Sequence, residues 1–142
     1  MQTHPLRLHP GDDLRGALET VSRERALRAA FVIQGIGSLA VAHLRFAGVD
    51  QPATLRGDLE ILTLAGSLSP DGAHLHMTVS DARGQVFGGH VARGCIVRTT
   101  AEVLVLALPE HAFSREHDGR TGFPELMIGA ATAAQEDDPY PG

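Results

Sequence analysis

Hydrophobic and polar residues alternate strictly between residues 73 and 80, which is the most regular pattern in the chain. Leu75, Met77 and Val79 point to one side of an extended backbone, and the polar residues between them point to the other. Period-two alternation predicts a β-strand with one buried face. The next four residues, Asp-Ala-Arg-Gly at 81–84, fit a type I turn with Asp first and Gly last. The pattern therefore predicts a β-hairpin.

The predicted turn also fixes which residues face each other across this hairpin. Counting outward from the turn places His76 directly opposite His90, on the polar face that also carries His74. Directly opposed residues have Cβ atoms roughly 4.5–5.5 Å apart, and diagonal neighbours about 7–8 Å. Three imidazoles should therefore converge, with space beside them at Gly88 and Gly89. A slip of one residue would turn His90 to the opposite face.

Three neutral imidazoles with an open fourth position are typical of an accessible zinc site, although imidazole also suits copper, iron and nickel. The alternative is a polar strand face with three solvated histidines. A zinc ion would lower the pKa of a bound water to about 7, and a hydrolase or lyase would then need a general base nearby. Glu60, Glu102 and Glu116 are candidates for this base, but no spacing in the sequence places any of them at the site.

One other segment has the period of an α-helix. An Asp-Asp pair at 12–13 supplies a cap and a favourable negative charge at the helix start. Leu14, Leu18 and Val21 then repeat at i, i+4 and i+7, which predicts one long helix that packs through this face. Ser22 falls on the opposite, polar side and is expected to face solvent.

The remaining apolar stretches predict strands. Strands are expected at residues 5–9, 30–33, 39–46, 59–68 and 96–108. In the strand at 59–68, alternation assigns Leu62, Leu64 and Leu68 to one face with Glu60, and Leu59 and Ile61 to the other. Gly66 marks a bulge or a close approach in this strand. The Gly-rich residues 34–38 are interpreted as a turn, because a phosphate loop would be followed by a helix rather than a strand.

Residues 103–108 are apolar on both faces of their strand, and one helix cannot cover a whole sheet. Either the sheet folds onto itself or another subunit covers its second face, and we favour both. The expected fold class is α+β, with a curved mixed or antiparallel sheet and one main helix. Residues 109–128 are expected to be mostly irregular, either as a surface loop or as a segment that completes a pocket. A single domain over 1–128 would precede a flexible acidic tail over 129–142.

Composition narrows the classes of function. The chain has 142 residues and a net charge of −5, and its 12 basic residues are all arginines. An acidic chain without a basic stretch is a poor candidate for binding DNA through the phosphates. The single cysteine, Cys95, is expected to be a buried, inert thiol in a reducing compartment. Neither a signal-peptide core nor an apolar run of ~20 residues is present, so we expect a soluble cytoplasmic protein without membrane contact.

The order of several motifs resembles the PPC (plants and prokaryotes conserved) domain family, in its stand-alone prokaryotic form. Three of the matching pieces are the Gly-rich stretch at 31–38, the Asp-Gly-Ala-His-Leu-His motif at 71–76 and the Gly-Gly-His motif at 88–90, and it is the combined order of the pieces that is specific. Further matching pieces lie at residues 57–66, 68–69, 94–95, 100–103 and 121–122. Together these pieces extend the resemblance over roughly residues 5 to 128.

The resemblance implies an α+β fold that packs as a homotrimer, and a metal at His74, His76 and His90. Prokaryotic members are often labelled as DNA-binding proteins, and plant members carry an AT-hook before the domain. This sequence has no Arg-Gly-Arg-Pro core of such a hook. The sequence therefore favours a homotrimeric binding or regulatory module with a divalent metal, zinc by preference. A metal-dependent hydrolase or lyase acting on a small molecule is the alternative, and direct DNA binding is supported only by the family label.

Overall fold

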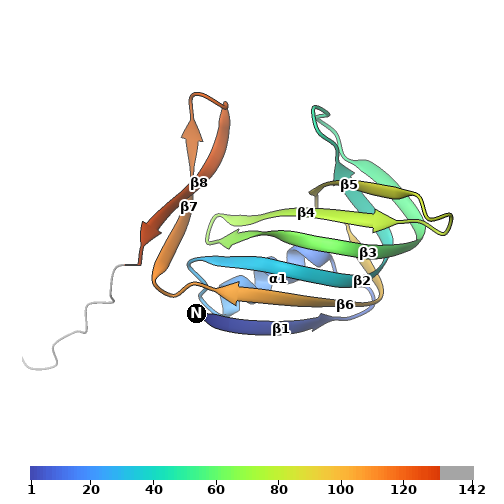
Figure 1. Cartoon of the computed structure of the whole chain (residues 1–142), viewed down its shortest axis with the longest axis horizontal. Coiled ribbons are helices and arrows are strands. Elements are labelled where there is room, and N and C mark those ends of the chain that lie inside the picture. The colour runs from blue at the N-terminus through green and yellow to red at the C-terminus, as the bar shows by residue number, and fades with distance from the viewer. Residues whose placement is uncertain (132–142) are drawn as a thin grey trace, which may run out of the picture.

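The computed structural model describes residues 1–131 and consists of a six-stranded sheet, one helix and a separate two-stranded hairpin (Figure 1). In sheet order the strands are β1 (Gln2–Leu8), β6 (Ile96–Ala107), β2 (Ala30–Arg45), β3 (Ala53–Ser69), β4 (Gly72–Ser80) and β5 (Val86–Val91). The helix α1 comprises Leu14–Glu24, and the hairpin consists of β7 (His111–Asp118) and β8 (Phe123–Ala130). The part of the expected acidic tail from residue 132 onward lies outside the described residues.

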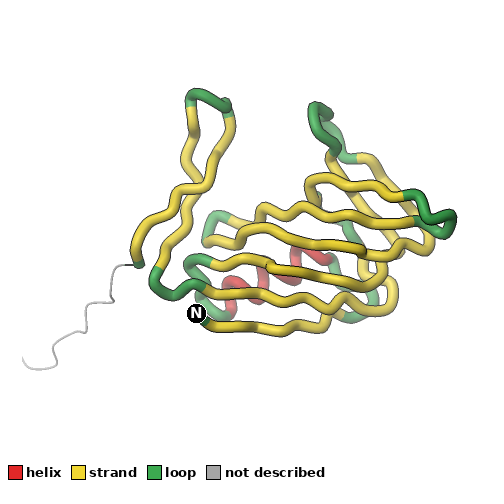
Figure 2. The backbone as a smooth tube through the Cα atoms, in the orientation of Figure 1, coloured by secondary structure: helices red, strands yellow, loops and turns green. Residues whose placement is uncertain are grey.

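The sheet curls because its last strand has two partners. β5 pairs with β4 along one edge, and its end pairs with the end of β2 through Leu44↔Val91 and Arg45↔His90. All pairings between the described strands are antiparallel, so the antiparallel form of the expected curved sheet is confirmed. Figure 2 shows the strand-rich main chain, with the single helix lying behind the sheet.

The hydrophobic core lies between α1 and one face of the curved sheet. Leu14 and Leu18 are fully buried in it, as the helical period predicts, and Asp13 caps the helix by accepting a hydrogen bond from the Gly16 amide. The expectation that Ser22 faces solvent is wrong, since only 5% of Ser22 is exposed. Glu19 is 7% exposed, and the helix therefore packs through a wider face than the leucine repeat alone indicates.

The turn expected at residues 34–38 does not exist, because β2 runs unbroken from Ala30 to Arg45. Bulges within β2 accommodate the irregular sequence while pairing with β6 continues on either side. Gly37 lies so close to β6 that a Cβ atom there would stand 2.2 Å from the Thr100 carbonyl oxygen. The glycines that suggested a turn instead allow two backbones to approach within the sheet.

The assignment of faces in the strand at 59–68 is also wrong, because a bulge lies between Ile61 and Thr63. A bulge adds one residue and reverses the alternation beyond it. The buried hydrophobic residues of this stretch are Leu59, Ile61, Leu64 and Leu68, which all belong to one core. Leu62 and Glu60 are exposed instead.

Residues 109–128 are not irregular, since they contain β7 and most of β8. This hairpin forms a two-stranded sheet of its own and stands apart from the larger sheet in Figure 1. Its anchor is Phe113, which is buried and packs edge-on against Phe31 with ring centroids 5.5 Å apart. The hairpin therefore lies beside the start of β4, close to His74.

Candidate metal centre

The histidine hairpin has the predicted register. His76 pairs with His90, Met77 with Gly89 and Val79 with Phe87. The turn closes as expected, because the Gly84 amide donates to the Asp81 carbonyl oxygen at 2.9 Å and the Asp81 amide donates to that of Gln85 at 3.0 Å. Alternation then places the three histidines on the face opposite the buried side chains of β4.

The rings of His74, His76 and His90 form one cluster. Each offers a ring nitrogen such that the three atoms lie within 4.8 Å of one another. The Nε2 atoms of His74 and His76 are 3.2 Å apart. Two nitrogens bound to one tetrahedral zinc at about 2.0–2.1 Å would be separated by roughly 3.3 Å, so this spacing fits a shared ion. His74 and His76 are exposed and His90 is half-buried, which leaves one side of the cluster open.

The surroundings of the cluster favour neutral imidazoles. Burial lowers the pKa of His90 to about 4, and the nearby charges of His74, Arg45 and Arg15 act in the same direction. Burial also lowers the pKa of His74, helped by the guanidinium of Arg115. A metal binds only the deprotonated ring, so these shifts keep ligands in the binding form at neutral pH.

His90 carries a further indication of a missing partner. Its Nδ1 atom is buried and has no hydrogen-bond partner among the described residues. Buried polar atoms without a partner are uncommon in folded proteins because they lose their hydration without compensation. The donor set of three imidazoles, one of them with an unused buried nitrogen, therefore fits a zinc ion.

Two charged residues of the projecting hairpin stand beside the cluster. Arg115 donates from Nη2 to the Ser67 hydroxyl at 2.8 Å, and the same nitrogen lies 3.3 Å from His74 Nδ1. Glu125 lines two cavities that include His74, one of them together with His76 and the other together with His90. The irregular pattern of residues 109–128 gave no strand assignment, so sequence reasoning missed both residues.

The three carboxylates considered as general bases lie elsewhere. Glu60 is exposed in β3, where it pairs with Ser38 and Ser80. Glu102 lines a cavity over β1, β2 and β6, and Glu116 lines another at the base of the β7–β8 hairpin. None of the three lines the two cavities that contain the histidines.

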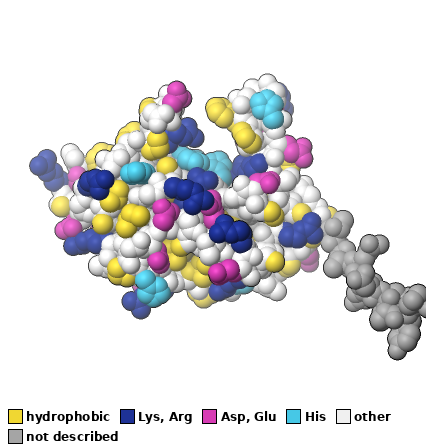
Figure 3. All heavy atoms as spheres, turned by 180° about the vertical axis from the view of Figure 1, so that it is seen from behind, with side chains coloured by type: hydrophobic (Ala, Val, Ile, Leu, Met, Phe, Trp, Pro, Cys, Tyr) yellow, Lys and Arg dark blue, Asp and Glu magenta, His cyan; other side chains and the backbone are white. Residues whose placement is uncertain are grey.

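The larger histidine cavity has a volume of about 600 Å³ and lies between the β2–β3 turn and the β7–β8 hairpin. Gly48 contributes from the turn, and Phe123, Pro124 and Glu125 contribute from β8. Figure 3 shows histidine side chains in the hollow between the two projecting lobes, with arginine side chains directly below them. The arrangement can hold a metal and a small molecule beside it.

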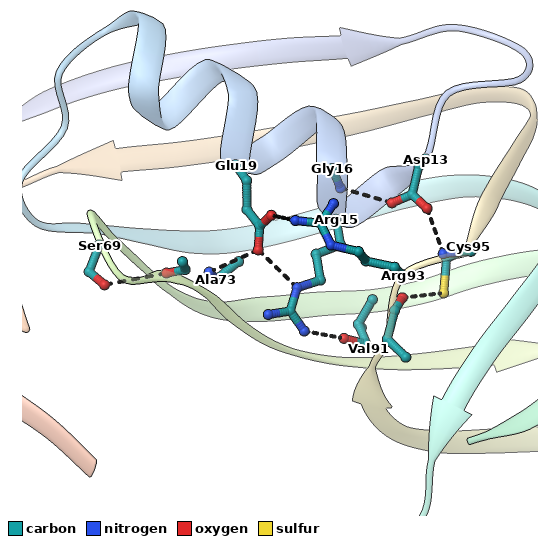
Figure 4. Close-up of polar contacts among 12 residues, drawn as sticks. Asp13, Arg15, Gly16, Glu19, Ser69, Ala73, Val91, Arg93 and Cys95 are labelled. Atoms are coloured by element: carbon teal, nitrogen blue, oxygen red, sulfur yellow. Dashed lines mark hydrogen bonds and ion pairs between the residues drawn. The ribbon is translucent and has the colours of Figure 1, made fainter. Parts of the chain in front are cut away.

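Two charged residues of α1, Arg15 and Glu19, form a network of polar contacts behind the site. The Glu19 carboxylate accepts hydrogen bonds from Arg15 Nε at 2.9 Å and from the Ala73 amide at 3.3 Å, and it also pairs with Arg93. Arg15 in turn donates from Nη1 to the Val91 carbonyl oxygen at 3.2 Å (Figure 4). Ala73 precedes His74 and Val91 follows His90, so one ion pair holds the backbone beside two of the three histidines.

The family model of the Plants and Prokaryotes Conserved (PCC) domain, also abbreviated PPC, matches residues 1–109. The chain belongs to this family. A solved hypothetical protein from Salmonella enterica has a TM-score of 0.90 to this PPC domain at 38% identity, with 92% of this chain and 95% of that chain covered. A metal-containing protein from Archaeoglobus fulgidus has a TM-score of 0.77 at 28% identity, with 89% and 94% covered.

Two curated proteins are also similar to this PPC domain. The bifunctional protein GlmU of Synechococcus sp. (strain JA-2-3B'a(2-13)) is 50% identical over 128 residues, which are 90% of this chain and 20% of that protein. AT-hook motif nuclear-localized protein 21 of Arabidopsis thaliana is 30% identical over 121 residues, which are 81% of this chain and 42% of that protein. The chain thus spans a fifth of the first relative and less than half of the second.

Two further observations concern residues outside the site. Cys95 is fully buried, and burial raises the pKa of its thiol to about 11, which is the inert state expected from the sequence. Among residues 1–131, no helix is long and apolar enough to cross a membrane.

Proposed function

We propose that this chain is a self-associating PPC-domain module that binds a divalent metal ion, zinc by preference, through His74, His76 and His90. The observation that carries the proposal is the 3.2 Å separation of the His74 and His76 Nε2 atoms, with His90 opposite His76 in the hairpin. The metal-containing relative from Archaeoglobus fulgidus supports the metal. Family resemblance supports a homotrimer, and the lone buried thiol suits a reducing cytoplasm.

The module would present its metal to solvent rather than bury it. Structural zinc sites are closed by four protein ligands, whereas three ligands leave a position for water or a small molecule. The open position would lie toward the two cavities beside the β7–β8 hairpin, because His74 lines both of them. A zinc ion held there would act as a Lewis acid and lower the pKa of a bound water. The site therefore suits ligand binding more than a purely structural role.

Direct DNA binding is not part of the proposal. The plant relative is named for an AT-hook, but this chain has a net charge of −5 and no such hook. Without a basic stretch to neutralise phosphates, non-specific affinity for DNA would be weak. The similarity to GlmU instead supports a role as one module of a larger assembly, since the matching region makes up only 20% of that bifunctional protein. A module that associates with itself and with other proteins agrees with both observations.

The test is the zinc content of the purified protein after chelation and reloading, measured by mass spectrometry of the eluted metal. The wild-type chain should hold one zinc per subunit, and His76→Ala should lose it while the protein stays folded. His9→Ala is the matched control, because His9 is exposed at the end of β1 and away from the cluster. Retention of zinc by His76→Ala, or absence of zinc from the wild type, would overturn the proposal.

The position of Glu125 favours a metal-dependent hydrolase or lyase as the second candidate. This carboxylate lines both histidine cavities, where a general base would be needed. Zinc-dependent hydrolysis of a small activated ester, absent from the His76→Ala protein, would support the enzyme. A zinc-loaded protein without turnover would leave the binding module as the function.

A further inference from the structure

The cavity beside the histidine cluster has an unusual wall, in which three arginines come from three different elements. Arg15 comes from α1, Arg45 from the end of β2 and Arg115 from β7. No two of them are near each other in sequence, so the fold alone brings them together. A cavity of about 600 Å³ lies within the size range of small-molecule sites.

Of the three arginines, Arg45 gives the strongest indication of a bound anion. It pairs with His90 across the β2–β5 ladder, so the two side chains lie on the same face of the sheet. Its guanidinium makes no hydrogen bond or ion pair with any residue between 1 and 131, although the residue is half-buried. An arginine that is always charged and carries five N–H donors is thus left without a protein partner beside the metal ligands.

The other two arginines are held in place but retain free donors. Arg15 uses Nε toward Glu19 and Nη1 toward the Val91 carbonyl oxygen. Arg115 uses Nη2 toward Ser67 and toward His74 Nδ1. Because each guanidinium has five N–H groups, each keeps donors for a ligand after these contacts are made. Donors that are already oriented bind an anion at little cost in side-chain entropy.

Metal binding would release one further donor. If zinc takes His74 through Nε2, the ring proton resides on Nδ1, and Nδ1 can no longer accept a hydrogen bond from Arg115. The Arg115 N–H that now faces His74 is then free to turn toward the cavity. Arg15 is paired with Glu19, so Arg45 and Arg115 balance the two carboxylates of the wall, Asp71 and Glu125. The zinc would add two further positive charges.

We propose that this cavity binds a small carboxylate-bearing molecule, whose carboxylate contacts Arg45 and Arg115 next to the three histidines. Its carbon skeleton would lie against Phe123 and Pro124, which form the apolar part of the wall. A carboxylate on a carbon skeleton fits better than inorganic phosphate, because phosphate has no apolar part to lie against Phe123 and Pro124. The inference rests on the proposed metal site, which would supply the net positive charge beside the cavity.

The test is isothermal titration calorimetry of the zinc-loaded and zinc-free proteins with acetate, isobutyrate, succinate and inorganic phosphate. We expect at least one carboxylate to bind more tightly than phosphate, and zinc loading to strengthen that binding. Arg45→Gln should weaken the binding by about tenfold or more, because one charge-assisted hydrogen bond is lost. Arg98→Gln is the matched control, since Arg98 is exposed in β6 and pairs with Asp58.

The outcomes separate this inference from the proposed function. Absence of zinc in the metal analysis would overturn the metal site, while the zinc-free titrations would still test the arginines. No carboxylate binding in either form, equal affinity in Arg45→Gln, or tighter binding of phosphate than of every carboxylate would overturn the ligand assigned to this cavity. Wild-type metal content in Arg45→Gln would show that the variant affects the anion and not the zinc.

Discussion

The placement of His74 depends on a neighbouring residue that has no side chain at all. Gly66 in β3 pairs with Leu75 in β4 and has a φ angle of +155°. A Cβ atom at this position would stand 2.0 Å from the His74 carbonyl oxygen and 2.8 Å from the Leu75 Cα atom. Real atoms do not approach so closely, so β4 can lie where it does only because residue 66 is glycine.

Replacement of this glycine by alanine should therefore destabilise the fold strongly. We expect Gly66→Ala to lower the free energy of unfolding by more than about 2 kcal/mol, because both the backbone strain and the collision must be relieved. Urea denaturation followed by circular dichroism would measure the change. Gly119→Ala is the control, since Gly119 faces open space and should change stability by less than about 0.5 kcal/mol. Equal losses in the two variants would contradict this account of Gly66.

Among the elements, α1 has a second role besides covering the core. Its Glu19 carboxylate and Arg15 guanidinium reach the backbone at Ala73 and Val91, on the strands that carry the histidines. Burial disfavours the charged form of Glu19, but hydrogen bonds from Arg15 and Ala73 and the charges of Arg15 and Arg93 outweigh it. The pKa of Glu19 therefore lies below its ordinary value near 4.5.

This shift gives a prediction with a definite sign. A carboxylate whose pKa is lower in the folded chain stabilises the fold above its unfolded pKa, and the contribution disappears as the pH falls through the folded value. Glu19→Gln should cost about 1–3 kcal/mol at pH 7, because charged hydrogen bonds are lost. The difference from wild type should shrink well below pH 4.5. Urea denaturation of the metal-free proteins across this range would measure it, with the exposed Glu24→Gln as control. A difference that does not depend on pH would contradict the charged role.

The elements also show where sequence reasoning succeeds and where it fails. The register of the histidine hairpin was predictable because a tight turn at Gly84 and strict alternation are local features. The bulge between Ile61 and Thr63 could not be predicted. Its extra residue is accommodated by the partner strand and is not marked in the sequence. The β7–β8 hairpin pairs mainly with itself, so it lacks the alternation that core packing imposes. Arg115 and Glu125 belong to it and were missed for that reason.

At the scale of the whole molecule, the outer face of the sheet exposes hydrophobic side chains. Along β6, Val103, Val105 and Ala107 face the core, whereas Leu104 points outward and is 38% exposed. Ile36 in β2 is 51% exposed and lines the same shallow cavity as Leu104. Apolar side chains gathered on one strand face are typical of a surface that another subunit covers. A second copy of this chain is the occupant that the proposed homotrimer implies.

A charge on this face should therefore separate the subunits without unfolding them. Ile36→Arg places a guanidinium opposite Glu102 in the β2–β6 ladder, so the single subunit tolerates it. We expect size-exclusion chromatography with light scattering to show a smaller particle and circular dichroism to be unchanged. Val86→Arg is the control, because it makes the same change at an exposed apolar residue of β5. An unchanged particle size would place the contact on another surface. A charge at the fully buried Val105 would instead disrupt the core and say nothing about assembly.

The pairing of β1 with β6 has a consequence for the order in which the chain folds. Gln2 pairs with Ala107, roughly 100 positions later, so the first of the described strands finds its partner only in the sixth. Closing so long a loop costs entropy before any contact repays it. The sheet can be completed only after residue 107 has left the ribosome. Any product that ends before β6 must leave β1 as an unpaired strand edge.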